Sequence, residues 1–268
     1  MVPEIPAARG GRTGPGADAP KVIVAEGLAI RFGKNTVFGD VSFDVREGEV
    51  FVILGGSGCG KSTLLTLLIG LRRPTAGRIT VLGEDLLAAR GEARRRLLRR
   101  FGVMFQLGAL FGSMTLLENV ALPIESFTDL PAEAVEAVAR AKLGMVGLGD
   151  AAAKLPSEIS GGMVKRAAIA RAMALDPPLL FLDEPSAGLD PITSAGLDQL
   201  ILALARDLGI TFVIVTHELA SILTVADRVI MLDKAAKGVI ATGDPRVLRA
   251  TSTEPTVRAF FNRIAEAA

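Results

Sequence analysis

A chain of 268 residues can form one large α/β domain with a substantial core, and its formal net charge of +1 gives no bulk electrostatic reason to expect nucleic acid as a partner. The single cysteine, Cys59, excludes an internal disulfide and a zinc site built from several cysteines, as is usual in a reducing compartment. No apolar run approaches the roughly 18 residues of a spanning helix, so we expect neither a membrane crossing nor a secretory signal.

The N-terminal part begins with residues 1–20, which are dominated by Gly, Pro and Ala. They carry too little apolar bulk to offset the entropy of ordering, so we expect a disordered tail. Short apolar strands follow at 22–25, 28–31 and 41–45. The apolar segment 50–54 then runs into a Gly-rich turn and a helix from 62 to about 71, and further strands are expected at 78–82 and 102–105.

The rest of the chain changes its periodicity twice. Helical periodicity dominates from Pro131, which suits a first helical turn, to about residue 174, and the helical block 115–175 is expected to form a separate lobe. Strands at 179–183, 211–216, 229–232 and 239–241 then alternate with helices that end near residues 208 and 226. This alternation predicts an α/β fold with a mostly parallel, helix-covered sheet over 21–245, followed by a helical extension at 246–268.

The Gly-rich turn carries the clearest chemical signal. It reads Gly-Gly-Ser-Gly-Cys-Gly-Lys-Ser-Thr, lies between a strand and a helix, and matches the phosphate-binding loop pattern. Glycines let backbone N–H groups approach a phosphate, and the N-terminus of the following helix favours negative charge. Lys61 would reach the β- and γ-phosphates of ATP and Ser62 would ligate Mg²⁺, whereas Cys59 is interpreted as a small filler. The nucleotide-binding residues expected here are Gly55, Gly56, Ser57, Gly58, Cys59, Gly60, Lys61, Ser62 and Thr63.

Two further strand ends extend this site. The apolar strand 179–183 ends in Asp183 and Glu184, which we expect to reach the metal and the attacking water respectively; in isolation two such acids could simply form a solvated turn. His217, the one histidine of the chain, follows the strand 211–216. A lone histidine is more often structural, but ligands collect at the carboxyl ends of parallel strands, so we expect His217 to contact the γ-phosphate.

In this order the motifs resemble an ABC ATPase domain, and the resemblance covers residues 22 to about 245. It implies a P-loop NTPase core with an N-terminal antiparallel β subdomain and a helical lobe that carries the family signature. It also implies that Phe32 stacks on adenine, at a position where Tyr is commoner, and that Gln106 senses Mg²⁺ and couples to a membrane subunit. This chain has no tyrosine.

The resemblance extends to two segments later in the chain. Residues 159–163, Ile-Ser-Gly-Gly-Met, resemble the signature that contacts the ATP of the opposite protomer, with Met163 where glutamine is usual. Asp190 ends a loop that resembles the one joining the two ATP sites of a homodimer. The resemblance thus implies catalytic roles for Glu184, His217, Lys61 and Gln106, a metal site at Ser62, Gln106 and Asp183, and nucleotide contacts from Phe32, Ser160, Gly161, Gly162 and Asp190.

Several fragments together resemble the Mla-type ATPases, which serve phospholipid transport between bacterial inner and outer membranes. They are residues 106–111, 118–120, 190–193 and 255–261, together with the methionine in the signature. This resemblance implies an integral-membrane permease, an MCE-domain lipid-binding partner and a peripheral place on the cytoplasmic face of the inner membrane. Importers of small solutes share the same cassette and remain the alternative.

Two other functions of P-loop proteins are alternatives to that of a transport ATPase. A ribosome- or DNA-directed ABC protein would need a second cassette or a long coiled-coil insertion, and a P-loop kinase would not explain Ser160-Gly-Gly or His217.

The basic run 94–100 is interpreted as a solvated helix face, with contact to anionic lipid or to a partner protein as alternatives. Val257, Phe260, Phe261 and Ile264 form one helical stripe, capped by Ser252 or Thr253, that packs either on its own domain or on the partner protomer.

Overall fold

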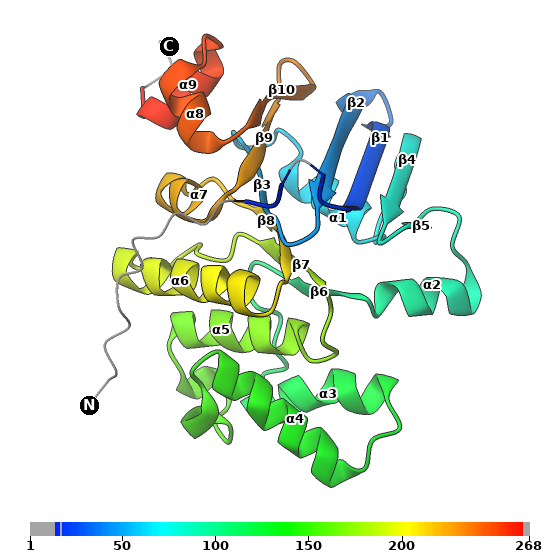
Figure 1. Ribbon diagram of the computed structural model, residues 1–268, viewed down its shortest axis with the longest axis vertical. Coiled ribbons are helices and arrows are strands. Elements are labelled where there is room, and N and C mark those ends of the chain that lie inside the picture. Colours follow the sequence, from blue (N-terminus) through cyan, green and yellow to red (C-terminus); the bar gives the residue numbers. More distant parts are fainter. Residues whose placement is uncertain (1–13, 17, 265–268) are drawn as a thin grey trace.

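The computed structural model describes residues 14–16 and 18–264, and most of the tail expected over 1–20 lies outside the described residues. Figure 1 shows a large sheet in the middle of the molecule, a smaller antiparallel sheet beside it and a group of helices at the opposite end. The large sheet has the strand order β10-β9-β3-β8-β7-β6. Its strands are β3 (Val50–Gly55), β6 (Phe101–Met104), β7 (Leu179–Asp183), β8 (Thr211–Val215), β9 (Arg228–Asp233) and β10 (Gly238–Gly243).

The large sheet is parallel from β6 through β7, β8 and β3 to β9, and only β10 is antiparallel to its neighbour. Every residue of β3 is buried, and alternate side chains serve the two faces of the sheet. Val50, Val52 and Leu54 join one hydrophobic cluster, whereas Phe51 and Ile53 join another. The run of apolar residues without alternation therefore reflects burial on both faces, which confirms the predicted α/β fold.

The smaller sheet is antiparallel with the order β2-β1-β4-β5. The two strands expected at 22–25 and 28–31 are one strand, which corrects that prediction. Its register shifts between Ala25 and Leu28, next to Gly27 with φ +57°, so a bulge interrupts the apolar pattern without ending the strand. The bounds are β1 (Lys21–Phe32), β2 (Asn35–Arg46), β4 (Ala76–Val81) and β5 (Glu84–Asp85).

Helices cover both faces of the large sheet. The leucines of α1 (Lys61–Leu68) share a cluster with Phe51 and with the smaller sheet, while α5 (Gly161–Ala172), α6 (Pro191–Asp207) and α7 (Leu219–Val225) pack on the other face. The remaining helices are α2 (Gly91–Leu98), α3 (Leu116–Phe127), α4 (Ala132–Met145), α8 (Pro245–Thr251) and α9 (Pro255–Asn262), with 3-10 turns at Gly149–Ala151 and Pro156–Glu158.

The helical block at 115–175 is divided more finely than its periodicity suggested. Pro131 is the N-cap of α4 and lies outside its first turn, and the two 3-10 turns separate α4 from α5. The helices α3, α4 and α5 of this block contact one another (Figure 1). Their apolar side chains nevertheless belong to the same cluster as Val50 and Val52 of β3, so the lobe shares one continuous core with the sheet.

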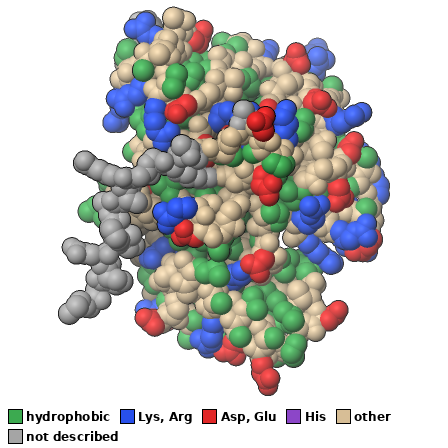
Figure 2. Space-filling view, viewed as in Figure 1, with side chains coloured by type: hydrophobic (Ala, Val, Ile, Leu, Met, Phe, Trp, Pro, Cys, Tyr) green, Lys and Arg blue, Asp and Glu red, His purple; other side chains and the backbone are tan. Residues whose placement is uncertain are grey.

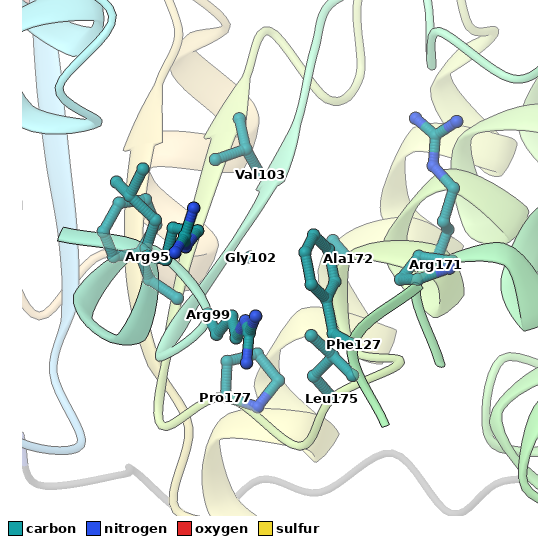
Figure 3. A pocket seen from close by; sticks show the side chains of 12 residues that line it. Arg95, Arg99, Gly102, Val103, Phe127, Arg171, Ala172, Leu175 and Pro177 are labelled. Carbon is teal, nitrogen blue, oxygen red and sulfur yellow. The ribbon is translucent and has the colours of Figure 1, made fainter. Parts of the chain in front are cut away.

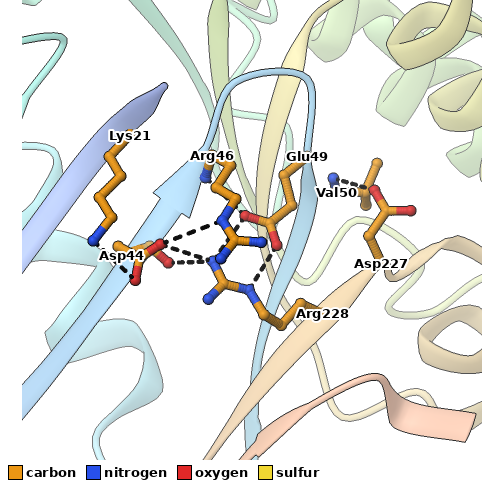
Figure 4. A network of polar contacts seen from close by, with 7 residues as sticks. All are labelled: Lys21, Asp44, Arg46, Glu49, Val50, Asp227 and Arg228. Carbon is orange, nitrogen blue, oxygen red and sulfur yellow. Dashed lines mark hydrogen bonds and ion pairs between the residues drawn. The ribbon is translucent and has the colours of Figure 1, made fainter. Parts of the chain in front are cut away.

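An ion-pair network joins the two sheets (Figure 4). Arg228, the first residue of β9, donates to both carboxylate oxygens of buried Glu49, at 2.8 and 3.1 Å, and to the carbonyl oxygen of Asp44 in β2 at 2.7 Å. Glu49 also accepts from the backbone N–H of Arg46 at 2.8 Å. Since Glu49 is buried but bonded on both oxygens, the network joins the C-terminal end of β2 to the start of β9 and to the residue before β3.

The C-terminal helices pack on the chain's own domain. Val257 and Phe261 of α9 are buried in the main cluster, and Phe260 lies at a ring-centroid distance of 5.3 Å from Phe261. The helix ends at Asn262, so Ile264 lies outside the expected stripe and is exposed. The predicted cap is also wrong, because Glu254 is the N-cap residue and the Ser252 hydroxyl accepts from the N–H of Glu254 instead.

The basic run 94–100 is only partly a solvated face. Arg94 points inward and donates to the carbonyl oxygens of Gly70 at 2.5 Å and Leu86 at 3.2 Å, while Leu97 is fully buried. Arg100 pairs with Glu84 at 3.1 Å. These bonds hold α2 against the loop that follows α1.

Candidate nucleotide-binding site

The phosphate loop leaves β3 through backbone conformations that suit glycine. Gly55 has φ +148°, and a Cβ there would lie 2.3 Å from the carbonyl oxygen of Leu232. Gly60 has φ +102° and is the N-cap of α1, and a Cβ there would lie 2.8 Å from Val37 Cγ1. The loop thus packs closely against Leu232 of β9 and Val37 of β2, and the glycines at these two positions of the loop allow both this close packing and the positive φ angles.

Side chains of the loop divide into exposed and buried ones. Ser57 and Ser62 are exposed, whereas Cys59 is buried among apolar side chains, and burial raises the pKa of its thiol. This supports the interpretation of Cys59 as a filler. Lys61 Nζ donates back to the carbonyl oxygens of Gly55 at 2.8 Å and Gly56 at 3.0 Å, so the lysine lies along the loop that it would share with a phosphate.

The two predicted carboxylates lie at the end of β7. Asp183 Oδ1 is buried and has no hydrogen-bond partner, and burial together with the negative charge of Glu184 raises the pKa of Asp183. An oxygen ligand aimed into a site without a protein partner is what a Mg²⁺ ion would satisfy, so the residues fit that metal. Among the described residues, no group of three or more His, Cys, Asp or Glu side chains could hold a metal by itself. The ion would therefore need Ser62 and the nucleotide as further ligands.

Glu184 and His217 form a hydrogen-bonded pair. His217 Nδ1 lies 2.8 Å from Glu184 Oε1, with 63% of the histidine side chain exposed against 12% for the glutamate. Glu184 has φ +45°, unusual for a non-glycine residue, and its N–H donates to the carbonyl oxygen of Val215 at 2.8 Å. The neighbouring strands β7 and β8 thus bring together the acid and the histidine that the sequence singled out.

Phe32 and Ser160, predicted to contact adenine and the ATP of the opposite protomer, are both exposed at the surface. Phe32 is 46% exposed, and the guanidinium of Arg72 lies 5.0 Å from its ring centroid. Ser160 is the exposed N-cap of α5, and its hydroxyl accepts from the N–H of Met163 at 3.3 Å. Gly162 is buried, and a Cβ there would lie 2.3 Å from Thr193 Cγ2, so it serves helix packing.

Asp190 stabilises the N-terminus of α6 as its N-cap residue. It caps α6, where Oδ1 accepts from the N–H groups of Ile192 and Thr193 at 3.0 Å and Oδ2 accepts from the Thr193 hydroxyl at 2.5 Å. These hydrogen bonds, first of all that from the Thr193 hydroxyl, lower the pKa of Asp190. The residue predicted to contact nucleotide is therefore an ionised helix cap.

The segment from Gln106 to Asn119 leads from the site to an exposed apolar surface. Gln106 follows β6 and is exposed, and Leu107 beside it is 87% exposed. Asn119 is fully buried: its Oδ1 accepts from the backbone N–H of Phe111, and its Nδ2 donates to the carbonyl oxygens of Phe111, Met114 and Thr115. The sequence predicted the permease surface between Gln106 and Asn119 but not that the side chain of Asn119 holds this segment in place.

An apolar pocket of about 290 Å³ lies beside that segment (Figure 3). It is lined by residues of α2 and β6, of the C-terminal halves of α3 and α5 and of the loop after α5, and Arg95 lies on the side opposite Phe127 and Leu175. Arg99 stacks on Phe127 at 4.8 Å. Figure 2 shows apolar side chains gathered over the part of the surface that α3 and α4 form. Phe127 at the end of α3 and Leu130 in the loop that follows it are both exposed.

Sequence analysis missed Lys165. This residue of α5 is buried, and its ammonium donates to the carbonyl oxygen of Gln106 and, at 3.4 Å, to that of Glu184. Burial lowers the pKa of Lys165, against the opposing influence of the Asp183 and Glu184 charges. Helical periodicity held the signal, because Lys165 shares a face with buried Gly162, Ala168 and Ile169.

Comparison with known sequences agrees with the motifs. A family model described as ABC transporter matches residues 38–187, more than half of the chain. The probable ribonucleotide transport ATP-binding protein mkl of Mycobacterium leprae is 43% identical over 240 residues, covering 90% of this chain and 68% of that protein. In Mycobacterium tuberculosis (strain H37Rv) the same comparison covers 66% of the relative, so the chain spans about two thirds of these proteins. The intermembrane phospholipid transport system ATP-binding protein MlaF of Escherichia coli K12 is 41% identical, covering 87% of this chain and 86% of MlaF.

Solved structures share the fold over most of the chain. The ATP-binding cassette MJ0796, a dimer in a post-hydrolysis state bound to ADP and Pi, matches with a TM-score of 0.74 at 29% identity, covering 83% of this chain and 98% of that one. The protein cbiO1 from Clostridium perfringens, part of the ABC transporter complex cbiONQ, matches with a TM-score of 0.78 at 27% identity, covering 91% and 99%. The sequence, the fold and the motifs lead to one conclusion: this chain belongs to the ABC transporter family, as an ATP-binding subunit.

Proposed function

We propose that the chain hydrolyses ATP and thereby energises phospholipid transport through a separate integral-membrane permease. The observation that carries this proposal is the placement of three strand ends. The neighbouring parallel strands β3, β8 and β7 end in the phosphate loop, His217 and the Asp183–Glu184 pair, so all three lie at one edge of the sheet.

In the proposed reaction, water attacks the γ-phosphate in line with the leaving oxygen. Glu184 orients the water and accepts its proton, and His217, bonded to Glu184 at 2.8 Å, keeps that carboxylate in place and contacts the γ-phosphate. Lys61 exchanges its bonds to the loop carbonyl oxygens for the β- and γ-phosphates. Ser62, Asp183 and Gln106 would hold Mg²⁺, which would partly neutralise the charge on the phosphoryl oxygens.

We infer that the working unit is a homodimer with two shared sites. Ser160 and Gly161 are exposed at the N-terminus of α5, where backbone N–H groups favour a phosphate. They would contact the ATP held by the phosphate loop of the other copy. Phe32 would present its exposed ring to adenine, and Asp190 would lie between the two sites.

For the membrane partner, we propose that the permease contacts the surface between Gln106 and Asn119. Leu107 and Phe111 are exposed apolar side chains there, and the pocket between α2 and α3 adds an apolar recess with arginines at its edge. None of the described helices is long and apolar enough to cross a membrane. The chain would therefore bind to the cytoplasmic face of the bacterial inner membrane through this partner, with an MCE-domain protein as lipid carrier.

The transported substrate has two candidates because the relatives bear different names. MlaF is named for phospholipid transport, and the mycobacterial proteins are named for ribonucleotide transport. We favour phospholipid because the match covers most of MlaF. Domain bounds of 21–245 for the ATPase unit and 246–268 for the extension remain our proposal.

The test is gentle purification of the intact complex from its native membrane, followed by mass spectrometry of bound subunits and lipids. We expect an integral permease, an MCE-domain protein and glycerophospholipid, and ATP turnover that depends on the permease. Recovery with a soluble solute-binding protein, and stimulation of ATP turnover by its ligand, would contradict the phospholipid proposal and favour a small-solute importer.

A further inference from the structure

Lys165 joins three segments of the proposed site: α5, the segment at Gln106 and the end of β7 at Glu184. It belongs to α5, the helix that Ser160 opens, and its ammonium donates to the carbonyl oxygens of Gln106 and Glu184. A buried ammonium is costly unless its hydrogen bonds and charge are compensated. The carboxylates of Asp183 and Glu184 supply part of the charge compensation, and Asp183 Oδ1 is itself buried without a partner.

A second cation of the same helix holds the same segment. Arg171 donates to the carbonyl oxygens of Ala109 at 2.7 Å and Gly108 at 3.0 Å. Gly108 and Ala109 have φ +76° and +51°, and a Cβ on Gly108 would lie 3.1 Å from Val164 Cγ1 of α5. The backbone from Gln106 to Ala109 therefore lies directly on α5, with Leu107 projecting into solvent.

We propose that Lys165 is a positioning residue that fastens Gln106 and Glu184 to the helix opened by Ser160, and whose charge opposes that of Asp183 and Glu184 while no divalent cation is bound. The inference rests on the proposed function for the roles of the two carboxylates and for the opposite protomer's nucleotide at Ser160. Its consequence is mechanical: a displacement of α5 by the opposite protomer's nucleotide moves Gln106 and the exposed Leu107 with it.

Three substitutions in the full chain separate hydrogen bonding from charge. Lys165→Gln keeps a donor but removes the charge, Lys165→Met removes both, and Lys165→Arg keeps both. Lys142→Met is the matched control, because Lys142 is a second buried lysine of the helical lobe that pairs instead with Asp176.

The first readout is amide hydrogen exchange over residues 105–111 without nucleotide. Lys165→Met should accelerate exchange there about tenfold or more, since the segment loses a buried anchor. Lys165→Arg should stay close to the wild type, and Lys142→Met should leave this segment unchanged. Unchanged exchange in Lys165→Met, or equal acceleration in Lys142→Met, overturns the positioning role.

The second readout is the affinity for Mn²⁺, measured by electron paramagnetic resonance with a non-hydrolysable ATP analogue. Removing a positive charge near Asp183 should tighten Mn²⁺ binding about 3- to 10-fold in Lys165→Gln and leave Lys165→Arg and Lys142→Met unchanged. Equal affinity in Lys165→Gln and wild type overturns the charge role. Failure of the wild type to bind Mn²⁺ with the analogue would instead contradict the proposed metal site, and the exchange experiment would still decide the positioning role.

Discussion

At the scale of single residues, the pair of Glu184 and His217 is the most specific chemical feature of the molecule. A non-glycine residue at φ +45° costs on the order of 1–3 kcal/mol, which the surrounding structure has to offset. The backbone bond to Val215 and the 2.8 Å bond to His217 hold Glu184 in that conformation. These two bonds fix the carboxylate at the end of β7.

Glu184→Gln should lower ATP turnover about 10²- to 10⁴-fold, as expected for the loss of a general base, and leave ATP binding intact because the phosphate loop is unchanged. Steady-state ATPase assays of the assembled complex and equilibrium nucleotide binding are the two measurements. Glu125→Gln, an exposed glutamate of α3, is the matched control. Near-normal turnover in Glu184→Gln would remove this residue from the proposed role.

Asp198 makes stability depend on pH in a direction opposite to most carboxylates. Burial raises the pKa of Asp198 to about 6, opposed by a hydrogen bond from Ser221 and assisted by the charge of Glu218. The folded protein therefore holds this proton more tightly than the unfolded chain, whose carboxyl has a pKa of about 3.9. Stability from this group is fully present below about pH 4 and is lost as the pH rises through 6.

Asp198→Asn, which mimics the neutral acid, should therefore raise the thermal midpoint at pH 7.5. Its advantage over the wild type should shrink as the pH falls through 6 toward 4. Thermal unfolding at pH 7.5, 6 and 4.5 tests this, with exposed Asp129→Asn as control. An advantage that is independent of pH would show that the charge of Asp198 is not its cause.

At the scale of elements, the C-terminal helix α9 shows what an amphipathic stripe can and cannot specify. The stripe predicted that Phe261 and Val257 are covered, and both are buried. It did not specify the end of the helix, because Arg263 adopts a left-handed conformation with φ +54° that carries Ile264 away from the stripe. In the described chain the covering surface is the domain's own core.

Truncation after Ala250 should lower the thermal midpoint in a concentration-independent way. Loss of burial of Val257 and Phe261 removes roughly 3–6 kcal/mol of gross stabilisation, at about 1.5–3 kcal/mol per side chain. Differential scanning calorimetry at two protein concentrations measures it, and removal of residues 265–268 alone is the control. A midpoint that stays unchanged, with loss of the dimer instead, would assign the helix to the partner protomer.

The ends of buried strands could be predicted from the sequence, whereas the bulge in β1, the strand β5 and the contacts of Lys165 could not. The positions of the phosphate loop, Asp183, Glu184 and His217 were predictable because each lies at or just after the end of a buried strand. The continuity of β1 was missed because Gly27, at its bulge, has the appearance of a strand end in the sequence. β5 was missed because it is only two residues long. Helical periodicity places Lys165 on the buried face of α5, but its partners are backbone carbonyl oxygens, which no side-chain pattern reveals.

At the scale of the whole molecule, two hydrophobic clusters lie on opposite faces of one sheet. The face with α1 carries the smaller sheet and Phe32, whereas the face with α5 and α6 continues into the helical lobe that carries Ser160. α1, which the phosphate loop opens, contacts β3, β7 and β8, and α5 contacts α3, α4, α6 and β6. In the proposed homodimer, the Ser160 region of a second copy completes each nucleotide site.

The central claim is that ATP is held between two copies of this chain, and the most direct measurement is analytical ultracentrifugation of the Glu184→Gln protein with saturating ATP and Mg²⁺. We predict conversion from monomer to dimer with two ATP molecules per dimer, abolished when Ser160→Arg is added while each monomer still binds ATP. A monomer at saturating ATP, or a dimer that Ser160→Arg leaves intact, would contradict the claim.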